Sequence, residues 1–194
     1  MPGKDVFEQE VKRLAVMYNT AIDFAVVPTA AICFSPDVLK ACEANICGKY
    51  NACWTCPPAI ESQEIQKEKI ISYSSAFVFT TISSLDDSFD YEGMIKAKER
   101  HNNITASMHE KFGKTNLVFG AGACEICGGL KYAGFQSGAL VPEPCAYPEP
   151  CRFPDKIFPS IEAAGIDVSA LSRAGGLRYN NGENTITYFS MLLF

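Results

Sequence analysis

The 194-residue sequence has no run of 18 consecutive apolar residues, only two histidines, and no excess of basic residues. The first absence argues against a membrane-spanning helix. The opening residues MPGKDVFEQEVKR also lack the apolar core of a secretory signal. The formal net charge of −5 gives no basic surface of the kind that binds nucleic acid. We therefore expect a cytoplasmic protein with neither a membrane nor a nucleic acid as partner.

Cysteine, in contrast, is abundant, with nine residues in the chain. A chain of this length buries on the order of 70% of its unfolded surface, so its core needs no disulfide bonds. In a reducing compartment, clustered thiols more often bind metal or do redox chemistry than form disulfides. An odd number of cysteines also fits a closed set of disulfides poorly. The composition therefore predicts a metal-binding protein.

Four of the cysteines lie between residues 124 and 154, in CEICGGLKYAGFQSGALVPEPCAYPEPCRFP. Their spacing is C-x2-C-x17-C-x5-C. Two thiolates separated by two residues can bind one metal, because a tight turn brings both sulfurs to the same side. Prolines around the second pair fix the backbone φ angle and remove amide donors, which favours a stiff, non-helical loop. The predicted ligands of this segment are Cys124, Cys127, Cys145 and Cys151.

A second set of four cysteines lies between residues 42 and 58, in CEANICGKYNACWTCPP, with the spacing C-x4-C-x5-C-x2-C. Gly48 permits a tight turn, because glycine adopts backbone conformations that are strained for other residues. A proline after a ligand cysteine recurs in ferredoxin-type sequences, although the x4 and x5 gaps do not match a ferredoxin. Trp54 and Tyr50 are interpreted as core aromatics, with shielding of a cluster from water as the alternative. The predicted ligands here are Cys42, Cys47, Cys53 and Cys56.

The remaining residues that could bind a metal or cofactor are interpreted as structural. Cys33 lies in the apolar stretch AAICF without a second thiol at ligand spacing, so we expect it to be buried. His101 and His109 are interpreted as packing or surface residues, with a mixed His/Cys zinc site as the alternative. The stretch GAGACE lacks the third glycine of a dinucleotide-binding fingerprint, so that function is rejected.

Hydrophobic periodicity predicts helices that alternate with strands. Helices are expected over residues 5–19, 36–42, 61–72, 90–112, 159–165 and 168–173. Strands are expected over residues 22–27, 75–82, 116–119 and 184–193. Ser35 followed by Pro36 predicts a helix start with the serine as N-cap. The predicted fold class is α/β (or α+β), with about four strands, flanking helices and two cysteine-rich metal-binding loops in a single domain over residues 1–194.

Three pieces of the sequence resemble one known family. They are CGKYNACWTCPP, the CEIC pair with the later PCAYPEPCRFP, and PSIEAAGIDV, which is close to a PSMEA-GIDV stretch in that family. Together with the apolar final strand, they resemble a family of small prokaryotic proteins catalogued only as predicted metal-binding proteins of unknown function. Residues 128–143 resemble an insertion before Cys145. The resemblance implies metal binding, in particular of iron–sulfur clusters, in a cytoplasmic and often anaerobic setting, and it implies no reaction.

Three functions are consistent with these cysteines. The first is an iron–sulfur protein with two [4Fe–4S] clusters, each bound by one set of four thiolates. The two sets could instead be pooled into fewer sites. Such a protein would act in electron transfer or redox chemistry with a partner protein. The second is a zinc-binding structural or interaction module, although the x5 gap is wide for a zinc ribbon. The third is an iron–sulfur enzyme, whose candidate pocket residues are Tyr50, Trp54, Lys131 and Arg152. We predict the first.

Overall fold

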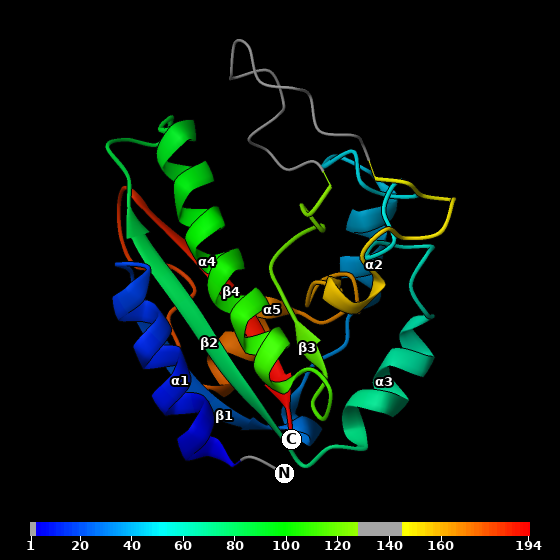
Figure 1. The fold of residues 1–194 in the computed structure, drawn as a ribbon, viewed down its shortest axis with the longest axis horizontal. Coiled ribbons are helices and arrows are strands. Elements are labelled where there is room, and N and C mark those ends of the chain that lie inside the picture. The colour runs from blue at the N-terminus through cyan, green and yellow to red at the C-terminus, as the bar shows by residue number, and fades with distance from the viewer. Residues whose placement is uncertain (1–2, 128–144) are drawn as a thin grey trace.

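The computed structural model describes residues 3–127 and 145–194 of the chain. In this part of the chain, four strands form one antiparallel sheet in the order β1-β2-β4-β3 (Figure 1). The strands are β1 (Ala21–Pro28), β2 (Ser75–Ser84), β3 (Val118–Phe119) and β4 (Thr185–Leu193). All four predicted strands are confirmed, and the antiparallel pairing of every neighbour makes the fold α+β.

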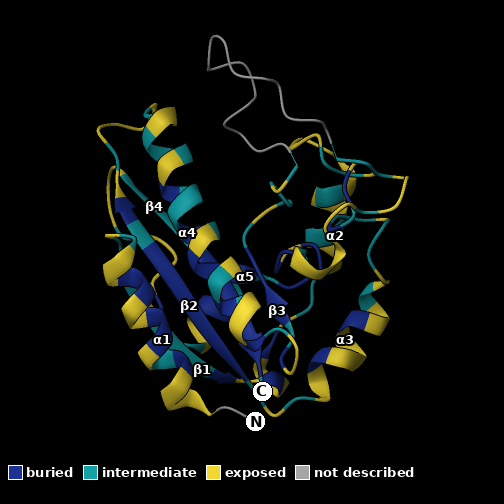
Figure 2. Ribbon diagram, viewed as in Figure 1, coloured by how far each residue is buried: buried dark blue, intermediate teal, exposed yellow. Residues whose placement is uncertain are grey.

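Both faces of the sheet are buried, because the central strand β2 sends apolar side chains to both sides. Phe77 and Phe79 belong to one layer of the core, and Ala76 and Val78 belong to the other. This alternation is the two-residue period of a strand. Figure 2 shows β2 as a largely buried strip through the middle of the molecule. The double burial explains why its sequence is a continuous apolar run and not an alternation of apolar and polar residues.

The first layer of the core is formed by α1 (Lys4–Met17) and α4 (Tyr91–Phe112), which lie along one face of the sheet (Figure 1). Phe7 of α1 is fully buried in this layer. Its ring centroid lies 5.6 Å from Phe77, 4.9 Å from Phe112 and 5.3 Å from Phe194. The predicted helices over residues 5–19 and 90–112 are therefore confirmed. No helix in the described residues is long and apolar enough to cross a membrane.

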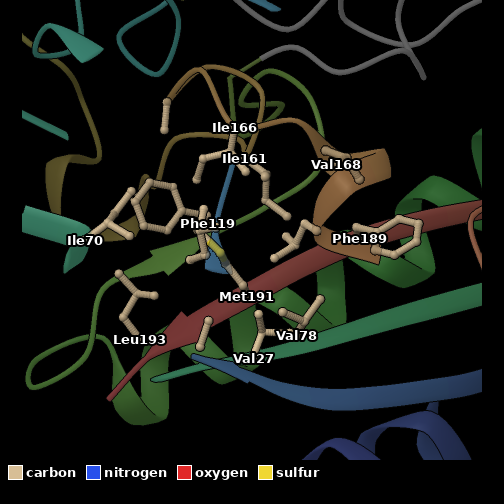
Figure 3. Packing of buried hydrophobic residues seen from close by; sticks show 14 of the residues in the cluster. Val27, Ile70, Val78, Phe119, Ile161, Ile166, Val168, Phe189, Met191 and Leu193 are labelled. Atoms are coloured by element: carbon tan, nitrogen blue, oxygen red, sulfur yellow. The ribbon is translucent and has the colours of Figure 1, made fainter. Parts of the chain in front are cut away.

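The second layer covers the opposite face of the sheet (Figure 3). It combines α5 (Val168–Ala174), Ile70 of α3 (Gln63–Ile71) and Ile32, which follows the 3-10 turn η1 (Thr29–Ala31), with further residues from strands and loops. Ile161 and Ile166 come from the loop before α5 and are both fully buried. This layer therefore ties the C-terminal third of the chain to the sheet.

His101 of α4 is fully buried against the sheet and is a packing residue, as predicted. Its Nδ1 lies 2.9 Å from Thr81 Oγ1 and its Nε2 lies 2.7 Å from Ser190 Oγ, so both ring nitrogens are satisfied inside the core. Burial lowers the pKa of His101 to about 3, because the imidazolium would lose its hydration. His109 packs against the ring of Phe158 with centroids 5.2 Å apart.

Cys33 is exposed, so the prediction of a buried structural cysteine is wrong. The backbone is extended here, and Phe34 pairs with Ile166 in an isolated bridge. Side chains alternate along an extended backbone, and the neighbouring Ile32, only 7% exposed, is the one that enters the core. The apolar composition of AAICF predicted burial of the segment but not which residue faces solvent.

The predicted helix over residues 159–165 is also wrong, because this segment forms turns. Its backbone groups bond to another part of the chain. Gly120 N–H donates to the Pro159 carbonyl at 2.9 Å, and Ile161 N–H donates to the Gly120 carbonyl at 3.0 Å. In a helix the Pro159 carbonyl would instead accept the Ala163 N–H, which here donates to Ser160 Oγ at 3.0 Å. Gly165 adopts the positive φ of +76° expected at a stop position.

Candidate metal centre

The first cysteine segment begins in α2 (Pro36–Glu43), whose start is set by Ser35. Ser35 Oγ accepts the Asp37 N–H at 3.3 Å, which confirms the predicted N-cap. Cys42 lies in the last turn of this helix, and the chain then continues through turns to Cys56. Gly48 has a φ of +68°, the left-handed conformation expected of it. Helix α2 therefore places Cys42 at the entrance to the loop that holds the other three cysteines of the set.

Cys53 and Cys56 are held in a tight turn. The Cys56 N–H donates to the Cys53 carbonyl at 3.1 Å, and Asn51 N–H closes the surrounding loop by donating to the Pro57 carbonyl at 2.9 Å. Cys53 is 2% exposed and is the one buried cysteine among the nine. The C-x2-C pair thus has the turn that its spacing predicts.

The second cysteine segment follows β3 through a turn in which Gly122 has a φ of +68°. The four cysteines of this set are partly buried. Residues 128–144 lie outside the described residues, and with them the predicted insertion and the candidate pocket residue Lys131. Cys127 and Cys145 are the described residues on either side of this gap.

Trp54 joins the two cysteine segments. Its Nε1 donates to the Glu149 carbonyl at 2.9 Å, and its ring meets Tyr147 edge to face with centroids 5.0 Å apart. The Tyr147 hydroxyl donates in turn to Asn51 Oδ1 at 2.9 Å. Figure 1 shows the two segments, coloured cyan and yellow, side by side near α2. Trp54 is only half-buried and belongs to this contact, so the prediction of a core aromatic is wrong for it.

Thr55 links the two segments directly at the cysteines. Its hydroxyl oxygen accepts the Cys124 N–H at 3.0 Å and lies 3.2 Å from Cys53 Sγ. Because the oxygen accepts from the amide, its own proton is available for donation to the sulfur. Thr55 is 2% exposed, so water does not compete for these bonds. Sequence reasoning missed this residue, although its position inside the C-x2-C pair was an available signal.

The Cys53–Cys56 pair favours one thiolate. A hydrogen bond from the Cys56 thiol lowers the pKa of Cys53 and raises the pKa of Cys56. Further hydrogen bonds, from the Thr55 side chain and from the Thr55 and Cys124 backbone, also lower the pKa of Cys53. The thiolate is the form that binds metal. Cys53 is therefore the thiol whose surroundings best favour coordination.

Other cysteines of both segments lie close enough to interact electrostatically. Burial raises the pKa of Cys124 to about 11, and nearby charges add to this effect, namely those of Cys53, Cys127 and Cys145. Burial also raises the pKa of Cys42, with a contribution from Cys47. Cys151 Sγ lies 3.4 Å from the Phe153 N–H, a donor from its own loop. The structure thus groups Cys53 with cysteines of the second segment.

The donor set fits a thiophilic metal or an iron–sulfur cluster. Both segments supply thiols, and hydroxyl and amide donors approach Cys53, which is the environment that stabilises a coordinated thiolate. Among residues 3–127 and 145–194, no three or more Cys, His, Asp or Glu side chains are arranged as a metal-binding group. In the described residues, Thr55 therefore holds Cys53 of one segment next to Cys124 of the other, without a complete coordination sphere around one metal position.

Comparison with protein-family models matches residues 25–194 to a family described as predicted metal-binding protein (DUF2284). No curated protein and no solved structure matches the chain. The family match begins inside β1 and spans both cysteine segments and the other three strands. It confirms the resemblance carried by the cysteine motifs. The chain therefore belongs to the DUF2284 family of predicted metal-binding proteins.

Proposed function

We propose that this protein binds iron–sulfur clusters through its two cysteine segments and acts in electron transfer or related redox chemistry. Membership of a predicted metal-binding family supports a metal in general. The choice of iron–sulfur rests on the ligand type, since both segments offer thiols and both histidines are engaged elsewhere. The observation that carries the proposal is Thr55, which holds Cys53 of one segment against Cys124 of the other.

Eight thiols suffice for two [4Fe–4S] clusters, because each cluster binds four thiolates. The sequence left open whether each set of four serves its own cluster or whether the sets are pooled. The link from Cys53 through Thr55 to Cys124 supports pooling. We therefore propose clusters that take ligands from both segments.

Such a cluster supplies single electrons at a potential set by hydrogen bonds to sulfur, by burial and by net charge. The chain supplies the hydrogen bonds, from the Thr55 hydroxyl to Cys53 and from the Phe153 amide to Cys151. The net charge of −5 favours approach to a basic redox partner protein.

The visible absorption spectrum of anaerobically purified protein tests this proposal, together with iron, sulfide and zinc per chain. We expect a brown protein with about eight iron and eight sulfide. About four of each would indicate one cluster shared by both segments. A colourless protein with one or two zinc ions would contradict the redox proposal and leave a zinc-binding structural module.

Single substitutions test the individual ligands. Cys53→Ser and Cys124→Ser should each lower the iron content, and Cys145→Ala and Cys151→Ala should do so when made separately. Cys33→Ser is the matched control, because Cys33 is exposed and lies outside both segments. Iron content at the wild-type level in any one of the four ligand variants would remove that cysteine from the ligand set.

A further inference from the structure

A pocket of about 310 Å³ lies between α4 and the segment that carries Cys124. Residues 121–126 form one wall, and α4 forms the second. The third wall is formed by Lys156, Ile157 and Phe158, at the end of the 3-10 turn η3 (Pro154–Lys156) and just after it. The volume is at the lower end of the range of small-molecule sites, about 300 to 1,000 Å³. Cys124 itself lines the pocket, so a molecule bound there would lie against the candidate metal centre.

One wall of the pocket is a connected polar group. Lys98 Nζ lies 2.5 Å from Glu125 Oε1, and Asn102 Nδ2 donates to Glu125 Oε2 at 2.8 Å. The side chains of Lys98 and Glu125 are 15% and 22% exposed, so the pair is largely shielded from water. Both carboxylate oxygens are engaged, and the positive charge of Lys98 is neutralised. This wall is therefore ordered before any ligand arrives.

Two glycines bring the walls of the pocket close together. A Cβ on Gly122 would lie 3.2 Å from Lys98 Nζ, and the φ of +68° at this position also disfavours a side chain. A Cβ on Gly120 would lie 2.5 Å from Cε2 of Phe158. The absence of these side chains allows the Cys124 segment to lie against both α4 and Phe158.

The remaining lining is mostly apolar, and it includes a cation at the rim. Ile95, Ile157 and Phe158 contribute apolar surface. Lys156 is exposed, and its Nζ makes no ion pair with a carboxylate of the described residues. Glu99 also lines the pocket but is already engaged in an interaction of its own. Lys156 Nζ lies 5.8 Å from the centroid of the Phe153 ring, a contact that leaves its positive charge unneutralised, so Lys156 is available to a negatively charged group.

We propose that this pocket binds a small organic anion with an apolar body, such as an aromatic carboxylate. The apolar body contacts Ile157 and Phe158, and the anionic group lies at Lys156. Binding depends only on these described residues. The role of the bound molecule as a substrate or effector of a centre at Cys124 rests on the proposed function.

Benzoate, benzamide and benzylamine are matched probes, because they share a ring and differ in charge. Ligand-observed NMR titrations of the full-length protein, purified anaerobically, should give the tightest binding for benzoate. Lys156→Met should weaken benzoate binding by about threefold, the effect of one exposed charge, and should leave benzamide binding unchanged. Lys114→Met is the control, because Lys114 is exposed and does not line the pocket.

Ala106→Trp should abolish binding of all three probes by filling the pocket. Ala106 is exposed on α4, so the larger side chain should be compatible with folding. Equal affinity for benzoate and benzamide would overturn the proposal, as would benzoate binding that survives Ala106→Trp or is unchanged in Lys156→Met. The visible spectrum of the same samples tests the metal proposal separately. Selective benzoate binding by a colourless protein would support the pocket while contradicting the redox function.

Discussion

Two buried polar residues, Thr55 and His101, form hydrogen bonds in different parts of the molecule, the first between the cysteine segments and the second between α4 and the sheet. The Thr55 hydroxyl contacts the Cys53 sulfur and accepts the Cys124 N–H of the other cysteine segment. Both ring nitrogens of His101 form hydrogen bonds with buried hydroxyls, those of Thr81 and Ser190. Each position is nearly inaccessible to water, so loss of a partner leaves a polar group unsatisfied. Both residues therefore allow sharp tests by single substitution.

Thr55→Val should destabilise the contact between the cysteine segments. The substitution keeps the shape of the side chain but leaves the Cys124 N–H without its acceptor, at a cost of about 1 to 3 kcal/mol. We expect a lower free energy of unfolding in denaturant and faster loss of iron to a chelator. Thr55→Ser retains the hydroxyl and should behave like the wild type. Loss of iron at the wild-type rate in Thr55→Val would show that the hydroxyl is not needed.

His101 should make stability depend on pH below about 6.5. Its pKa in the folded protein is about 3, against 6.5 for an unburied histidine, so between these values the unfolded state binds the extra proton. Stability is therefore lost as the pH falls, by about 1.4 kcal/mol per pH unit in this window.

Denaturant unfolding of wild type and His101→Gln between pH 6.5 and 5 measures this effect as a difference in slope. His109 contributes a slope of the same sign, because burial lowers its pKa too, but that slope is common to both proteins. Parallel stability curves would contradict the assignment of the effect to His101.

Among the elements, α1 and α4 depend on the phenylalanine cluster that joins them to β2. Phe7→Ala should lower the free energy of unfolding by about 3 to 5 kcal/mol, because it removes a fully buried ring and leaves a cavity. Val16→Ala on the same helix is the control, since Val16 is 84% exposed and should change stability little. A small effect of Phe7→Ala in chemical denaturation would indicate that α1 docks by other contacts.

The elements also show where local sequence is sufficient. Helix α2 follows from Ser35 and Pro36, and β2 follows from its apolar run, because capping and burial act on neighbouring residues. The segment 159–165 has similar helical features but forms turns, since its backbone bonds to Gly120, about 40 residues earlier in the chain. A partner so distant leaves no local pattern that could have corrected the prediction.

At the scale of the whole molecule, metal removal should disorder the two cysteine segments and leave the sheet folded. The sheet and its two core layers are built from apolar side chains and include none of the cysteines. Trp54, the single tryptophan, lies at the contact between the cysteine segments. A chelator should therefore shift tryptophan fluorescence to the red while far-ultraviolet circular dichroism stays almost constant. Cooperative loss of both signals would show that folding as a whole depends on the metal.

The sequence by itself determined which donor groups the two cysteine segments offer and most of the secondary structure. Thiols at C-x2-C spacing, apolar periodicity and a capping serine are local features, and their physical consequences are local as well. The family match to residues 25–194 agrees with the cysteine motifs. Metal identity and cluster count remain predictions on this basis.

Only the tertiary structure decided which of these local features meet. The bond between Thr55 and Cys124 joins residues 69 positions apart, and the Lys98–Glu125 pair joins residues 27 positions apart. The antiparallel order β1-β2-β4-β3 and the exposure of Cys33 also depend on packing between distant segments. Burial of both faces of the sheet fixes β3, from which the Cys124 loop leaves. The hydrogen bond between Thr55 and Cys124 then joins that loop to the one that carries Cys53.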